Sequence, residues 1–141
     1  MSPLIEKLSA QHRELVALLN AVTERGVSSP EGRKLLLSAR DALLAHLALE
    51  DKEMYPALAA AARTRPALRS TLDQFAADMD VVSAMAVEFF QRFGDDARPV
   101  DSFQFAREQG KFMAALRARI RKEEVVLYPE YETLGRVPSK P

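Results

Sequence analysis

Apolar residues recur along the chain at alternating spacings of three and four, the periodicity of one buried face of a helix. Four such segments follow one another, and no segment alternates with a period of two. The third segment is the most regular, and its inward positions are Leu68, Leu72, Phe75, Met79, Val82, Ala86, Phe89 and Phe93. The pattern predicts an all-α protein with four helices.

Local start and stop signals divide this pattern. The expected helix starts are Ser2-Pro3, Ser29-Pro30, the end of the Arg63–Pro66 connection, and Asp101 or Ser102 after the turn-rich DDARPVDS. Gly26 and Gly94 are expected to end the first and third helices. The second and fourth helices run into Tyr55-Pro56 and Tyr128-Pro129, and because proline has no amide hydrogen, the second is expected to bend or end there.

Four helices of about 20 to 30 residues with short connections favour an antiparallel up-down-up-down bundle. The 141 residues are enough for one domain, which we assign to residues 1–135. Residues 136–141 are expected to be a frayed C-terminal tail.

Composition narrows the classes of function. The chain has 20 basic and 20 acidic residues, and this balance argues against nucleic acid or a membrane surface as partner. It has no cysteine, which excludes disulfides and thiolate metal sites. With no signal-peptide core and no apolar run of about 18 residues, we expect a cytoplasmic protein. A protein partner and the oligomeric state stay open.

Polar residues occupy positions that the periodicity assigns to the interior. They are His12, His46, Glu50, Arg119 and Glu123, and the two histidines are the only ones in the chain. Burying a charge costs several kcal/mol, so we expect these residues to share one layer as a site or a buried network. His46 and Glu50 are four residues apart on one helix face and can hold one ion together. Imidazole and carboxylate suit iron, manganese or zinc.

An internal repeat links the second and fourth helices. HLALEDKEMYP, which begins at His46, matches RIRKEEVVLYP 73 residues later. Glu50 falls on Glu123, and Tyr55 falls on Tyr128. The two tyrosines are expected to be packing residues whose hydroxyls find a partner. The basic residues interleaved with Glu123 and Glu124 are expected, apart from Arg119, to form a solvated helix face.

These segments resemble the hemerythrin-like (HHE cation-binding) family over nearly the whole chain. The family has a histidine on its first helix, and QHRELVALL matches it with His12. The family's second helix carries an HxxxE motif, which HLALEDKEMYPAL matches. Its last helix carries a second HxxxE followed by LYP, and RIRKEEVVLYPEYE matches the Glu and the LYP. Met79, in DMDVV, and Arg119 stand where the family has histidines. The resemblance implies a hemerythrin-like bundle in which one metal of two keeps its ligands, namely His12, His46, Glu50 and Glu123. Methionine is a poor ligand for iron, so Met79 is expected in the core.

Two interpretations of the polar layer stay open. One is a site for at most one non-haem iron or other divalent metal. The other is a metal-free network in which Arg119 forks across Glu50 and Glu123 as a substitute cation. The first predicts a protein that binds or senses a metal, oxygen, nitric oxide or a redox signal, rather than one that carries oxygen. The second predicts a regulatory bundle that binds another protein. No nucleophile–base pair or nucleotide fingerprint indicates an enzyme.

Overall fold

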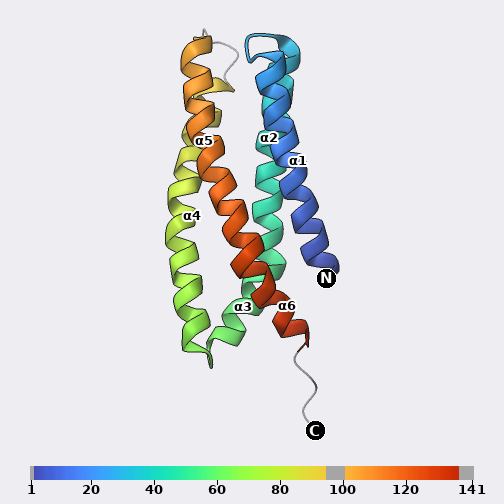
Figure 1. Cartoon of the computed structure of the whole chain (residues 1–141), viewed down its shortest axis with the longest axis vertical. Helices are drawn as coiled ribbons and strands as arrows, with labels where there is room; N and C mark the ends of the chain where they lie inside the picture. Colours follow the sequence, from blue (N-terminus) through green and yellow to red (C-terminus); the bar gives the residue numbers. More distant parts are fainter. Residues whose placement is uncertain (1, 95–100, 137–141) are drawn as a thin grey trace.

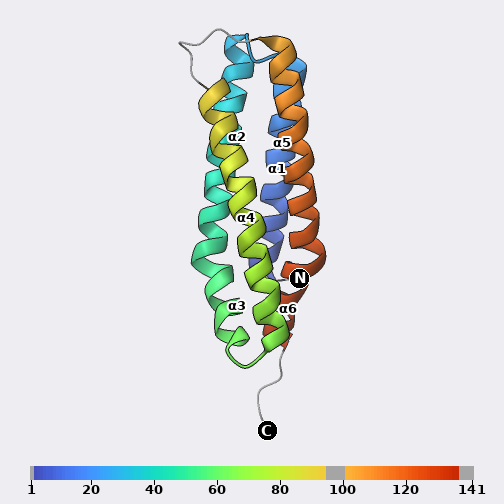
Figure 2. The same cartoon turned by 90° about the vertical axis from the view of Figure 1, so that its left-hand side faces the viewer.

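The computed structural model describes residues 2–94 and 101–136, the last two by their backbone alone. Four long helices lie side by side, each antiparallel to the next in sequence (Figures 1 and 2). They are α1 (Pro3–Arg25), α2 (Pro30–Leu49), α4 (Pro66–Phe93) and α5 (Ser102–Lys122). The prediction of an all-α up-down-up-down bundle is confirmed. Most of the DDARPVDS turn and nearly all of the expected tail lie outside the described residues.

The helices start and stop at the expected signals. The hydroxyl of Ser2 accepts a hydrogen bond from the amide of Ile5, and the side chain of Asp101 caps the first turn of α5. Such caps contribute about 1 kcal/mol each. Gly26 ends α1 with a φ of 82°, a value that glycine adopts without strain. Among the described helices, none is long and apolar enough to cross a membrane.

Both Tyr-Pro pairs follow a π turn, in which the hydrogen bond spans five residues instead of four. The turn η1 (Glu50–Met54) joins α2 to α3 (Tyr55–Ala62), and η2 (Glu123–Leu127) joins α5 to α6 (Tyr128–Arg136). The amide of each tyrosine donates to the carbonyl of the glutamate that opens its turn. The chain therefore stays helical through each proline, and the sequence repeat is also a repeat of structure.

Two apolar clusters fill the bundle on either side of a polar layer. The first contains five phenylalanines in mutual contact, of which Phe89 and Phe112 are stacked with their ring centres 4.9 Å apart. The second packs Ile5 and Leu8 of α1 against residues of η1, α3 and η2. The polar layer between them consists of His12, His46, Glu50, Arg119 and Glu123, all at most 4% exposed. Apolar packing on both sides keeps bulk water away from these side chains.

The expected core position of Met79 is wrong, because Met79 is only half-buried. It lies on α4 at the level of the polar layer. There the guanidinium of Arg119 reaches α4 from the neighbouring helix α5 and stacks on the Phe75 ring, one turn before Met79, at 4.7 Å from its centre. The interior next to this turn of α4 is therefore filled by Arg119. A smaller difference lies at the start of α1, where Ile5 is buried and Leu4 is half-buried.

Candidate metal centre

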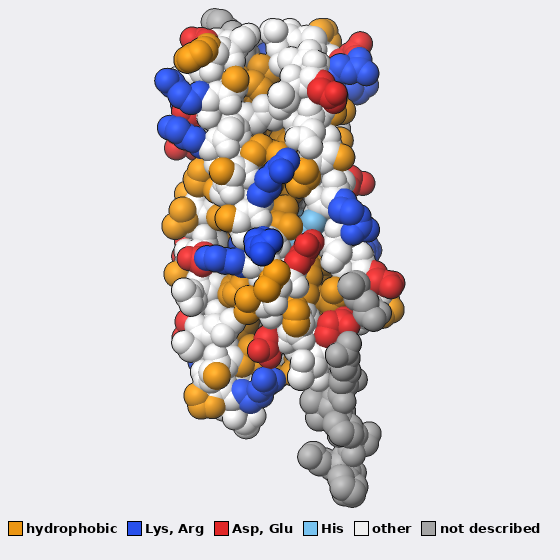
Figure 3. Space-filling view, in the orientation of Figure 1, with side chains coloured by type: hydrophobic (Ala, Val, Ile, Leu, Met, Phe, Trp, Pro, Cys, Tyr) orange, Lys and Arg blue, Asp and Glu red, His pale blue; other side chains and the backbone are white. Residues whose placement is uncertain are grey.

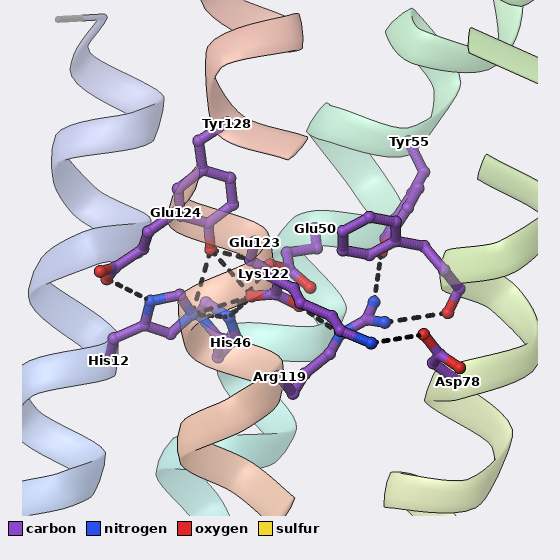
Figure 4. A network of polar contacts seen from close by, with 11 residues as sticks. His12, His46, Glu50, Tyr55, Asp78, Arg119, Lys122, Glu123, Glu124 and Tyr128 are labelled. Atoms are coloured by element: carbon purple, nitrogen blue, oxygen red, sulfur yellow. Dashed lines mark hydrogen bonds and ion pairs between the residues drawn. The ribbon is translucent and has the colours of Figure 1, made fainter. Parts of the chain in front are cut away.

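Four candidate ligands come from four different elements. His12 lies in the middle of α1, His46 near the end of α2, Glu50 at the start of η1 and Glu123 at the start of η2. One nitrogen or oxygen of each lies within 4.8 Å of the corresponding atoms of the others. Figure 4 shows these side chains pointing toward one another from the surrounding helices. The structure thus brings together the residues that the sequence predicts to share a layer.

The two imidazoles meet through their Nε2 atoms, which are 3.0 Å apart. The opposite nitrogen of each ring is held by an oxygen. Nδ1 of His12 lies 2.8 Å from Oε2 of Glu124, and Nδ1 of His46 lies 2.8 Å from Oε1 of Gln11. Because these oxygens can only accept, each Nδ1 carries a hydrogen. A neutral ring can carry no second one, so both Nε2 lone pairs face the same point.

The centre of the layer holds more hydrogen-bond acceptor atoms than hydrogen atoms available for donation. Around the two Nε2 atoms lie Oε1 of Glu123, 2.9 Å from His12, and Oε2 of Glu50, 3.1 Å from His46. The Tyr128 hydroxyl donates to Glu50 at 2.9 Å, and its burial beside both carboxylates raises the pKa of Tyr128 far above the usual value. This single hydrogen cannot serve all of these atoms. The arrangement needs a cation among them, either a proton on an imidazole or a metal ion.

In the absence of a metal, the proton belongs on His46. Burial disfavours its charged form, but hydrogen bonds to Glu123 and Glu50 outweigh burial and raise the pKa of His46 to about 9. Burial also raises the pKa of Glu50, and His46 offsets only part of that effect. Burial would do the same for Glu123, but its close contacts with the imidazoles of His12 and His46 and the charge of Arg119 hold its pKa well below the usual range. Glu123 is the permanent anion of the pair.

Arg119 binds one carboxylate and not two. Its Nε donates to Oε2 of Glu123 at 2.9 Å, Nη1 donates to the carbonyl of Phe75, and Nη2 donates to the hydroxyl of Tyr55. The expected fork across Glu50 and Glu123 is therefore wrong. Glu50 lies on the other side of Glu123, where the Tyr128 hydroxyl and His46 contact it. The guanidinium instead fills the space between Tyr55 and α4 (Figure 4).

Sequence reasoning missed three participants in this network. Gln11 and Glu124 anchor the two histidines, and the hydroxyl of Tyr128 lies among the candidate ligands. Tyr128 is buried and finds a partner, as expected of a packing residue, but its partners are the ligand atoms themselves. The repeat held a signal for Glu124, since the paired acids EE and ED occupy the same place in both copies.

A surface pocket of about 610 Å³ borders the outer edge of this network. It lies between α1 and α6, and Glu124 and Tyr128 are among its lining residues. In the space-filling view, a small part of a histidine is visible between the helices at mid-height (Figure 3). The donor set of two imidazoles and two carboxylates fits one ion of iron, manganese or zinc.

The comparisons with known proteins agree with this geometry. The model of the hemerythrin HHE cation-binding domain matches residues 4–131. The match covers all four long helices and both π turns. No curated protein and no solved structure matches the chain significantly.

Proposed function

The chain belongs to the hemerythrin HHE cation-binding family, and from that premise we propose that it holds one non-haem metal ion, iron in the first place, between His12 and His46. Glu50 and Glu123 complete the ligand set. The protein uses this ion to bind or sense a metal, oxygen, nitric oxide or a redox signal in the cytoplasm. Bound iron would supply an open coordination position or a one-electron exchange.

The observation that carries the proposal is the meeting of the two Nε2 atoms. Both rings are turned so that their anchored nitrogens face outward and their lone pairs face inward, 3.0 Å apart. Metal-binding histidines have this arrangement, with the second ring nitrogen donating to a carboxylate or carbonyl oxygen. Two neutral imidazoles would repel each other through these lone pairs, so the pair needs either a metal ion or a proton on one Nε2.

The side of the polar layer next to α4 and α5 supports the proposal that only one ion is bound. This side is occupied by Arg119, which is 4% exposed and uses three of its nitrogens for hydrogen bonds. Two immobile cations sharing Glu123 so closely would repel each other. Reversible oxygen carriage by an iron pair draws electrons from two metals, so we assign a binding or sensing role. No residue of the centre has the arrangement of a catalytic nucleophile with its base.

One observation favours a second candidate. Every buried side-chain nitrogen and oxygen of the described residues has a hydrogen-bond partner without any metal. The ion pair of Arg119 with Glu123 and a protonated His46 can therefore balance the buried charge. In that case the protein is a metal-free regulatory bundle that binds another protein.

Metal content separates the two candidates. The protein is purified without chelator or affinity metal, titrated with Fe²⁺ under anaerobic conditions, and desalted before elemental analysis. The proposal predicts one iron per chain in the parent and none in His46→Gln, which removes a ligand but keeps a polar side chain. Glu14→Gln, at an exposed position of α1, is the control and should bind as the parent does. A parent that retains no iron would favour the regulatory bundle.

A further inference from the structure

Two consecutive glutamates hold one imidazole from its two edges. Glu123 places Oε1 2.9 Å from Nε2 of His12, and Glu124 places Oε2 2.8 Å from Nδ1 of the same ring. Neighbouring residues of a regular helix point about 100° apart and rarely reach one side chain together. Here both lie at the start of the wider π turn η2, facing α1.

Glu124 differs from its neighbour in its surroundings. Its side chain is 42% exposed, whereas those of His12 and Glu123 are at most 3% exposed. Glu124 therefore adds little to core packing. What it supplies is an acceptor that fixes the hydrogen of His12 on Nδ1 and holds the plane of the ring. With the hydrogen on Nδ1, a neutral ring presents the lone pair of Nε2 to the centre.

The repeat provides an internal comparison. Asp51 follows Glu50 in η1 just as Glu124 follows Glu123 in η2. Asp51 is exposed and makes no hydrogen bond or ion pair with another described residue. No third histidine exists that it could hold. The two acids thus share a backbone position and a charge, and only Glu124 has an imidazole to orient.

We propose that Glu124 is the positioning residue of the centre, which selects the metal-binding tautomer of His12 from outside the ligand set. The inference rests on the proposed function, since it assigns His12 as a ligand. It extends that function, because the centre then contains a carboxylate–imidazole pair directed at the ion. The carboxylate raises the basicity of the imidazole, so Nε2 becomes a stronger metal ligand. Loss of such an outer partner typically weakens metal binding about 10- to 100-fold.

Three variants test this role: Glu124→Ala, Glu124→Gln and the matched control Asp51→Ala. Calorimetric titration with Zn²⁺ should show dissociation constants about 10- to 100-fold higher for Glu124→Ala. Glu124→Gln keeps an oxygen at the same reach and should recover most of the loss. Asp51→Ala removes an equal charge from the equivalent position and should bind as the parent does. Equal loss in Glu124→Ala and Asp51→Ala would overturn the proposal, because charge alone would then explain the effect.

A spectroscopic measurement decides the same point without metal. In protein labelled with ¹⁵N-histidine, the parent should show a slowly exchanging Nδ1–H signal from each imidazole, one held by Glu124 and one by Gln11, beside the Nε2–H signal of protonated His46. Glu124→Ala should lose the His12 signal and keep the Nδ1–H signal of His46, which serves as an internal standard. If both Nδ1–H signals persist in Glu124→Ala, Glu124 does not set the tautomer. A parent that binds no Zn²⁺ would refute the proposed function alone, and these signals would still test the role of Glu124.

Discussion

The two halves of the bundle share a backbone and differ in the side chains that they place at its centre. The half formed by α1, α2 and η1 brings two imidazoles and Glu50 into the polar layer. The half formed by α4, α5 and η2 repeats the π turn and the Tyr-Pro pair, but it brings Arg119 and leaves Met79 half-buried. Glu123 belongs to the second half by sequence and contacts both, through His12 and through Arg119.

This difference separates what maintains the fold from what binds an ion. The π turns, the caps and the apolar clusters are present in both halves regardless of which polar residues lie between them. One half directs lone pairs at a shared point, whereas the other fills the matching space with a fixed positive charge. Under the proposed function, the number of ions is therefore set by the side chains of each half and not by the shared backbone.

The largest expected change comes from converting the second half into the first. The double variant Met79→His with Arg119→His removes the guanidinium and places imidazoles at the two positions where the family resemblance puts histidines. Glu50 and Glu123 are both present to be shared between two ions. Elemental analysis after iron titration should rise from one to two ions per chain. If the double variant stays at one ion or fewer while it remains folded, the guanidinium is not what excludes the second ion.

The two carboxylates should differ in their contributions to stability. Glu123→Ala leaves the buried guanidinium of Arg119 without its anion, so we expect a loss of about 3–5 kcal/mol in the free energy of unfolding. Glu50→Ala leaves Arg119 paired and removes hydrogen bonds from Tyr128 and His46, so the loss should be about 1–3 kcal/mol. Urea unfolding of the metal-free variants measures both values. Equal losses would mean that Arg119 does not depend on Glu123.

A further effect, comparable in size to that of Glu50→Ala, should follow pH in the metal-free protein. Because burial is outweighed by the hydrogen bonds to Glu123 and Glu50, the pKa of His46 rises from 6.5 to about 9 on folding. The folded state then binds this proton more tightly than the unfolded chain does. The resulting stabilisation, about 3 kcal/mol, is complete below pH 6.5 and is lost as the pH rises through 9.

Urea unfolding with chelator between pH 6 and pH 10 measures this dependence. His46→Gln should flatten the curve over the same range, and a curve that keeps its slope in this variant would assign the effect to other groups. Bound metal should reverse the trend, because the ion competes with protons for the imidazoles and binds better as the pH rises.

Much of the fold could be predicted because local chemistry decides it. The Ser-Pro starts, Asp101 and Gly26 act through hydrogen bonds or backbone angles within a few residues of themselves. Helical periodicity also placed the charged residues of α5 and η2 correctly, since Arg119 and Glu123 are both buried. Whether the second helix bends or ends at Tyr55-Pro56 could not be predicted from the neighbouring residues alone. A π turn forms there, and the burial of Glu50 and Met54 that accompanies it depends on the packing of the other helices.

The candidate site was predictable in its members and less so in its contacts. A stripe of positions shows that His12 and Glu123 face inward, but not which oxygen each nitrogen meets. Glu124 lies next to a buried residue and was expected only as part of a charged stretch, because neighbouring residues of a regular helix face different directions. The direction of Arg119 was equally inaccessible, since its partners Phe75 and Tyr55 are 44 and 64 residues away.

The central claim is that one half of the polar layer holds an ion and the other holds Arg119. Anomalous diffraction from crystals of the Zn²⁺-loaded protein tests this claim most directly. We expect a single peak per chain, about 2.0–2.1 Å from Nε2 of both His12 and His46, with the guanidinium of Arg119 still bonded to Phe75 and Tyr55. A second peak between Glu123 and α4, or no peak at all between two imidazoles that remain in contact, would contradict the account.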